Sequence, residues 1–150
     1  MSRSRQLIGA LAIASSLIIL TGPAVAASTR GATAAKTVVD QMNEPLPDKL
    51  TATQKACLAK GIAPLADKKG RDAAAEFFGV VYDCKAFEVL GLLELTARKQ
   101  TLTKAGVVCF SNAIQRTGRV AFVQAIQLGS SDKRVKRLRD SWTKECPKVK

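Results

Sequence analysis

Four cysteines constrain what this chain can fold into more than any other feature of its sequence. They are Cys57, Cys84, Cys109 and Cys146, separated by 27, 25 and 37 residues, and the chain contains no histidine. The spacing includes no C-x-x-C pair, and without histidine the common Cys/His zinc sites are excluded. An even number of cysteines in an exported chain is typical of disulfides. We therefore expect two disulfides, no metal and no other cofactor.

The first 26 residues have the order of a secretory signal peptide. Two arginines are followed by an apolar stretch over residues 7–20 and then by Ala24-Val25-Ala26. This order predicts cleavage after residue 26. The alternative is a retained membrane anchor, since the segment is about long enough to span a bilayer, but Gly22-Pro23 disfavours an uninterrupted helix. We therefore expect a secreted or periplasmic protein.

The segment that follows, residues 27–49, is expected to be a flexible leader. It is rich in alanine and threonine and ends in Glu44-Pro45-Leu46-Pro47. Only Val38, Val39 and Met42 offer apolar surface that could be buried, so a packed structure is not predicted there. Residues 50–150 form the expected disulfide-linked helical domain.

This domain contains an internal repeat. The segment that starts at Leu50 matches the segment that starts at Leu102, with an offset of 52 residues throughout. In both copies a threonine, Thr51 or Thr103, precedes a cysteine by six residues and can cap the start of a helix through its hydroxyl. The match indicates a duplicated unit.

The apolar spacing predicts an all-α fold, a small bundle of about five to six helices, in which a helical-hairpin unit is duplicated and linked by two disulfides. Beyond the first helix of the domain, we expect helices over residues 71–82, 86–99, 104–117, 120–128 and 133–145. Residues 86–99 are apolar almost all round and form the expected central helix. On its exposed strip Glu94 and Arg98 can pair at i, i+4. No segment alternates with period two for long enough to predict a strand.

Two disulfide maps are compatible with this layout. Pairing within each copy gives Cys57–Cys84 and Cys109–Cys146, while pairing between copies gives Cys57–Cys109 and Cys84–Cys146. The loop entropies are similar, so energy does not choose between the two maps. We favour pairing within each copy, because a duplicated unit is expected to contain its own bridge.

No catalytic motif is present. The lack of histidine removes the commonest general base, and the chain has no G-x-S-x-G, Walker or Rossmann sequence. Asp72 and Glu76 share a helix face, but a solvated acidic face explains them better than a carboxylate pair for glycoside hydrolysis. We therefore expect no enzymatic activity.

The formal net charge of the chain is +12, or +10 once residues 1–26 are removed. The most strongly charged segment is the last predicted helix. One side of this helix is apolar and ends at a cysteine, so Val135, Leu138, Trp142 and Cys146 are expected to face the core. The opposite side is basic and is the candidate surface for an anionic partner, with Lys133, Arg134, Lys136, Arg137, Arg139 and Lys144.

Such a surface can bind an anionic envelope component or an acidic protein. The alternative is that the basic side of the helix has no partner and is only solvated. Nucleic acid is a weaker candidate, because the chain is exported and lacks exposed aromatic residues among the cations. The oligomeric state is not predicted. The leading hypothesis is a non-enzymatic extracytoplasmic binding module. The alternative is a carrier that encloses a small apolar ligand among Phe77, Phe78, Phe87, Leu90 and Leu93.

The repeated Leu-Thr-x5-Cys motif, Cys84 between its two copies and the apolar segment with Leu92-Leu93 resemble small exported bacterial four-cysteine helical proteins of unknown function. The resemblance covers about Leu50 to Cys146. It implies an all-helical fold and an extracytoplasmic location, and it supplies no activity. Members of that group tend to be acidic, whereas this chain is basic.

Overall fold

The computed structural model describes residues 24–146, with side chains from residue 30 onward. Within these residues it is all-helical, with seven α-helices, one short 3-10 helix and no strand. In chain order the elements are α2 (Ala24–Asn43), α3 (Ala52–Ile62), η1 (Ala63–Leu65), α4 (Gly70–Asp83), α5 (Phe87–Ala97), α6 (Lys104–Thr117), α7 (Arg119–Leu128) and α8 (Lys133–Glu145). The all-α prediction is confirmed, and the helix count exceeds the expected five to six.

The additional helix is α2, and it corrects the expectation of a flexible leader over residues 27–49. It packs against α3 and η1 and buries Ala35, Val38 and Val39. Helix α2 approaches η1 closely at Gly31, where a Cβ would lie 2.9 Å from the Ala63 carbonyl oxygen. Small residues on this face allow the close approach, and alanine is the best helix former. The predicted leader is therefore part of the packed fold.

The chain after α2 is also ordered by hydrogen bonds. Lys49 Nζ donates to the Glu44 carbonyl at 2.7 Å and to the Leu46 carbonyl at 3.0 Å, and Asn43 Oδ1 accepts from the Leu50 amide at 2.8 Å. These contacts satisfy backbone groups near the end of α2. The predicted signal peptide lies almost wholly outside the described residues, and its expected cleavage point after Ala26 falls within α2. Among residues 24–146, no helix is both long and apolar enough to cross a membrane.

The first disulfide unit is a hairpin of α3 and α4. Thr51 caps α3 as predicted, because its hydroxyl accepts from the Gln54 amide at 3.2 Å while the Gln54 side chain accepts from the Thr51 amide. Cys57 in α3 is bonded to Cys84 at the end of α4, with their Cα atoms 5.6 Å apart. The bridge joins the middle of α3 to the end of α4, so the chain folds back on itself between the two helices.

The second unit starts in the same way and ends differently. The Thr103 hydroxyl accepts from the Gly106 amide at 3.1 Å, and Cys109, six residues after the cap, is bonded to Cys146. Cys146 follows α8, so α7 lies between the two bridged helices. Gly118 separates α6 from α7 with a positive φ of 82°, a conformation that favours glycine. The disulfide pairing within each copy is thus the one that the structure contains.

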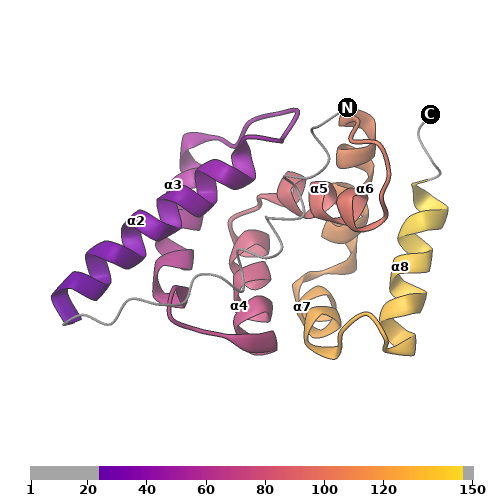
Figure 1. Cartoon of the computed structure of the whole chain (residues 1–150). Coiled ribbons are helices and arrows are strands. Elements are labelled where there is room, and N and C mark those ends of the chain that lie inside the picture. Colours follow the sequence, from indigo (N-terminus) through magenta and orange to yellow (C-terminus); the bar gives the residue numbers. More distant parts are fainter. Residues whose placement is uncertain (1–23, 147–150) are drawn as a thin grey trace.

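Helix α5 lies between the two units, and its closest partner is α6 (Figure 1). Its buried residues include Val89, Leu90, Leu92 and Leu95, which agrees with the central role predicted from its composition. Figure 1 places α2 and α3 on one side of the molecule and α8 on the other, with α4 to α7 between them. The expected basic surface on α8 is therefore on the opposite side of the molecule from the N-terminal helix.

Candidate functional site

The apolar side of α8 is used entirely for packing. Val135 and Trp142 are buried, Leu138 is packed against the core, and Cys146 is 2% exposed. The Trp142 indole Nε1 donates a hydrogen bond of 2.9 Å to Thr117 Oγ1 on α6. The predicted buried stripe is confirmed, and a burial of this kind removes Trp142 from any role as a membrane anchor.

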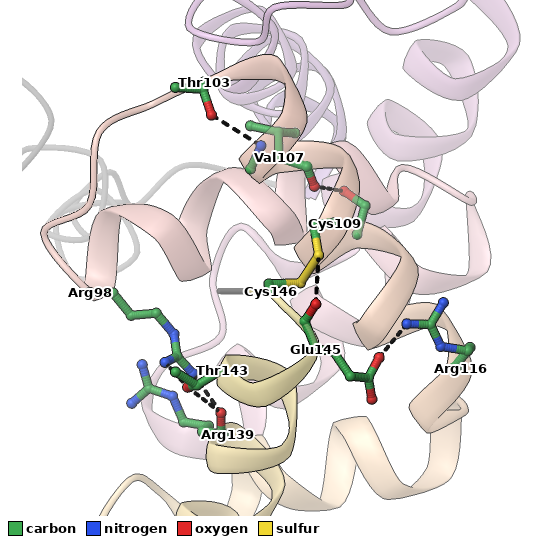
Figure 2. Close-up of a disulfide and its surroundings, with 11 residues drawn as sticks. Arg98, Thr103, Val107, Cys109, Arg116, Arg139, Thr143, Glu145 and Cys146 are labelled. Carbon is green, nitrogen blue, oxygen red and sulfur yellow. Dashed lines mark hydrogen bonds and ion pairs between the residues drawn. A yellow bond between two sulfur atoms is a disulfide. The ribbon is translucent and has the colours of Figure 1, made fainter. Parts of the chain in front are cut away.

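One flank of α8 is held by a charged cluster that joins it to α5. Glu94 Oε1 accepts from Arg98 Nε at 2.7 Å and from Arg139 Nε at 2.9 Å. Arg98 Nη2 also donates to the Arg139 carbonyl at 2.8 Å, and its Nη1 donates to Thr143 Oγ1 (Figure 2). The Arg98 guanidinium lies over the Phe110 ring, 5.1 Å from its centroid. Two cations therefore share one carboxylate beneath α8.

The predicted pair of Glu94 and Arg98 exists, but the strip on which it was placed is not exposed. The two side chains are only 12% and 15% exposed, because α8 covers them. Arg139, expected on the partner surface, belongs to this covered cluster and is 31% exposed. Arg139 thus serves to position α8 and is not part of the free basic face.

The other flank of α8 is held near the second disulfide. Arg116 on α6 forms an ion pair with the Glu145 carboxylate, and Cys109 Sγ lies 3.6 Å from the Glu145 carbonyl oxygen (Figure 2). Both contacts sit at the end of α8, next to the Cys109–Cys146 bond. Together with the Glu94 cluster they attach the helix to α5 and α6 along both sides.

Asp132 forms the start of α8. Its carboxylate accepts from the Arg134 amide at 2.7 Å and from the Arg134 side chain at 3.1–3.2 Å. The hydrogen bond from the Arg134 side chain, with that from its amide, lowers the pKa of Asp132 below the ordinary value. Asp132 is thus the N-cap of α8. Arg134 is consequently paired locally, although it remains exposed.

Four of the six predicted cations remain, and we call them the basic ridge: Lys133, Lys136, Arg137 and Lys144. All four are exposed, and none has a carboxylate partner among residues 24–146. They fall on the side of α8 opposite Val135 and Trp142 because helical residues repeat every 3.6 positions. The ridge is about 17 Å long, from the rise of about 1.5 Å per residue between Lys133 and Lys144.

An acidic residue on the same side of the helix was not predicted from the sequence. Asp140 is exposed, and it lies four residues from both Lys136 and Lys144. It forms no ion pair within the described part of the chain. Its spacing in the sequence was sufficient to place it on the ridge, where it lowers the local positive charge by one.

The aromatic residues named for a carrier site contact one another. The ring centroids of Phe77 and Phe78 are 5.4 Å apart. Those of Phe87 and Tyr82 are 4.9 Å apart, in an edge-to-face arrangement. Leu90 is buried, and Leu93 is packed against the core. Phe122 of α7 lies against both Phe78 and Tyr82. This cluster therefore joins α4, α5 and α7 as core packing.

Asp72 and Glu76, the two carboxylates weighed as a pair for glycoside hydrolysis, are both exposed on α4. Glu76 pairs with Lys68 at 2.6 Å, and Asp72 lies in the first turn of α4, where a negative charge is favourable. No group of three or more metal-ligating side chains occurs in residues 24–146.

Comparison with known proteins adds no relative: no family model, no curated protein and no solved structure matches this chain. A function can therefore be inferred only from the chain itself, above all from the geometry of α8.

Proposed function

We propose that this protein is a non-enzymatic binding module of the extracytoplasmic space, and that the basic ridge of α8 engages an anionic partner. The partner is an anionic envelope component or an acidic protein. The observation that carries the proposal is the state of the four ridge cations, which are exposed and have no carboxylate partner in the described chain. Two disulfides support a location outside the reducing cytoplasm.

The attachment of α8 supports the same proposal. Arg139, Trp142 and the Cys109–Cys146 bond fix the helix backbone from the side that faces the core. The ridge cations therefore project from a rigid support, and only their side chains lose freedom when a partner binds. Pre-organisation of this kind lowers the entropic cost of association.

The chemistry of the ridge also restricts the mode of binding. The apolar residues of α8 are packed against the core, so the helix has no free apolar face to insert into a membrane. Binding through the ridge is then electrostatic and takes place at a surface. An interaction of this type weakens steeply as the salt concentration rises, because exposed charges are screened over about 8 Å at physiological ionic strength.

The test compares two variants of equal net charge. In the first, Lys133, Lys136, Arg137 and Lys144 are all changed to Gln. In the second, the same change is made at four exposed cations of the opposite side, Arg30, Lys36, Lys60 and Lys69. Binding to phosphatidylglycerol vesicles and to immobilised polyglutamate is measured over a range of salt concentrations.

We expect the ridge variant to lose about three orders of magnitude in affinity, from about 1 kcal/mol for each of the four cations at an anionic surface. The control variant should retain most of its binding. A preference for vesicles would indicate an envelope component, and a preference for polyglutamate would indicate an acidic protein. Equal losses in the two variants would contradict the proposal, because net charge alone would then explain the binding.

A further inference from the structure

The two disulfides differ in the solvent exposure of their cysteines. Cys57 is exposed on α3, whereas Cys109 is only half-exposed on α6. Their partners are both buried, with Cys84 at 7% and Cys146 at 2% exposure. A thiolate must reach a sulfur atom along the S–S axis to break a disulfide, so access is one determinant of the rate of exchange. The first bridge therefore has the more exposed end, at Cys57.

Two lysines lie next to the first bridge in the sequence. Lys60 lies three residues after Cys57 on the same helix, which makes the two neighbours on its surface, and Lys85 directly follows Cys84. The nearest acidic residue in sequence, Asp83, is neutralised by Arg119, which donates to it at 2.6 Å and 2.8 Å. At the second bridge, Cys109 Sγ faces the Glu145 carbonyl oxygen, and the Glu145 carboxylate is paired with Arg116.

We propose that the Cys57–Cys84 disulfide is a site of exchange with small anionic thiols. The thiolate of a carboxylate-bearing thiol attacks Cys57 Sγ, a new S–S bond forms between them, and the bond to Cys84 breaks. The electron pair of the broken bond stays on Cys84, whose thiolate then takes a proton from water. Lys60 and Lys85 attract the incoming carboxylate, and Lys85 also stabilises the leaving thiolate.

The hairpin keeps other contacts that hold it while the bridge is open. Gln54 Nε2 on α3 donates to the Lys85 carbonyl at 2.9 Å, across the same junction as the disulfide. Leu58, the neighbour of Cys57, is fully buried. The opened cysteines therefore stay close together, so the Cys84 thiol can return to Cys57 and expel the added thiol.

The experiment is timed exchange of the native protein with 3-mercaptopropionate, an anionic thiol, and with cysteamine, a cationic thiol. Samples are quenched in acid, alkylated and mapped by mass spectrometry. We expect the first bridge to open roughly tenfold faster than the second, because Cys57 is more exposed than Cys109. We also expect the added thiol on Cys57 and not on Cys84.

A charge variant tests the role of the two lysines. With Lys60 and Lys85 both changed to Gln, we expect the rate with 3-mercaptopropionate to fall about threefold relative to the unmodified protein, and the rate with cysteamine not to fall. The control, Lys36→Gln with Lys69→Gln, should leave both rates unchanged. Equal opening of the two bridges, or prior opening of Cys109–Cys146, would overturn the proposal. Equal slowing of both thiols in the lysine variant would overturn the preference for anionic thiols.

Discussion

The first disulfide unit bridges two consecutive α-helices, α3 and α4, whereas the second bridges α6 and α8 across an intervening helix. Both units begin with a threonine cap and a cysteine six residues later. In the first unit the bridged cysteine of α3 stays exposed, and α2 packs on α3 and η1. In the second unit α8 is joined to α5 and α6 by ion pairs as well as by the bridge.

The same capped helix start, a threonine followed six residues later by a cysteine, therefore occurs in two different structural roles. The first unit uses its bridge and the packing of α2 to stabilise a hairpin. The second uses its bridge to fix a helix whose outer side carries the basic ridge. Because α7 lies between α6 and α8 in the sequence, the second disulfide also closes the longer loop. Its cysteines are 37 residues apart, and those of the first disulfide are 27 residues apart.

Removal of each bridge should give the largest effect and separates the two units most directly. In Cys57→Ala with Cys84→Ala and in Cys109→Ala with Cys146→Ala, we expect the free energy of unfolding to fall by about 3.5–4 kcal/mol each, from loop entropy. Amide hydrogen exchange should accelerate mainly in α3 and α4 for the first variant and in α8 for the second. Acceleration spread equally over both units in either variant would show that they do not behave as separate units.

A smaller effect is expected where α2 meets the first unit. Gly31→Leu places a side chain against the Ala63 carbonyl, which is backbone and cannot move aside. We expect the free energy of unfolding to fall by about 2 kcal/mol, as in other overpacked sites, measured by urea unfolding of the chain without residues 1–26. The control is Ala32→Leu, because Ala32 is exposed on the same helix. If the two variants are equally stable, α2 does not pack on the hairpin in solution.

The smallest effect concerns the caps and depends on pH. The caps of α3 and α6 are threonines, which do not titrate, whereas α8 is capped by Asp132, whose pKa is lowered by Arg134. A carboxylate with a lowered pKa in the folded state stabilises at pH above its ordinary pKa, about 3.9, and this contribution is lost as the pH falls through the lowered value.

We therefore expect the protection of α8 amides, taken relative to the intrinsic exchange rate at each pH, to fall on acidification before that of α3 or α6. Asp132→Asn keeps a capping side chain without the charge, so it should make the acid response of α8 shallower. An unchanged acid response in this variant would show that other carboxylates control the stability of α8.

Much of the second unit was predictable because its helix ends have local signals. Thr103 and Gly118 delimit α6, and Asp132 begins α8, so the predicted ranges 104–117 and 133–145 agree with the structure. Helix α2 was missed because its buried face is made largely of small residues. Gly31, Ala35, Val38 and Val39 do follow helical spacing, but alanine and glycine give little hydrophobic signal, and only docking on α3 and η1 buries them.

Some features of the candidate site could likewise be predicted from the sequence, and others could not. The side of α8 on which each cation lies follows from helical periodicity alone, and so does the position of Asp140. The separation of Arg139 from the ridge did not follow, because its partner Glu94 is 45 residues away in sequence. The local pairing of Arg134 with Asp132, two residues apart, was within reach of the sequence and was overlooked.

The sequence by itself determined the helical class, the two capped starts and the candidate cysteine pairs, because these depend on residue spacing and on contacts within one turn of helix. Only the tertiary structure decided which of the two disulfide maps exists, whether the segment before residue 50 is packed, and which cations remain free. The physical reason is that each of these depends on contacts between helices that are distant in sequence. Local propensities do not encode such contacts, and the packing of the whole molecule selects them.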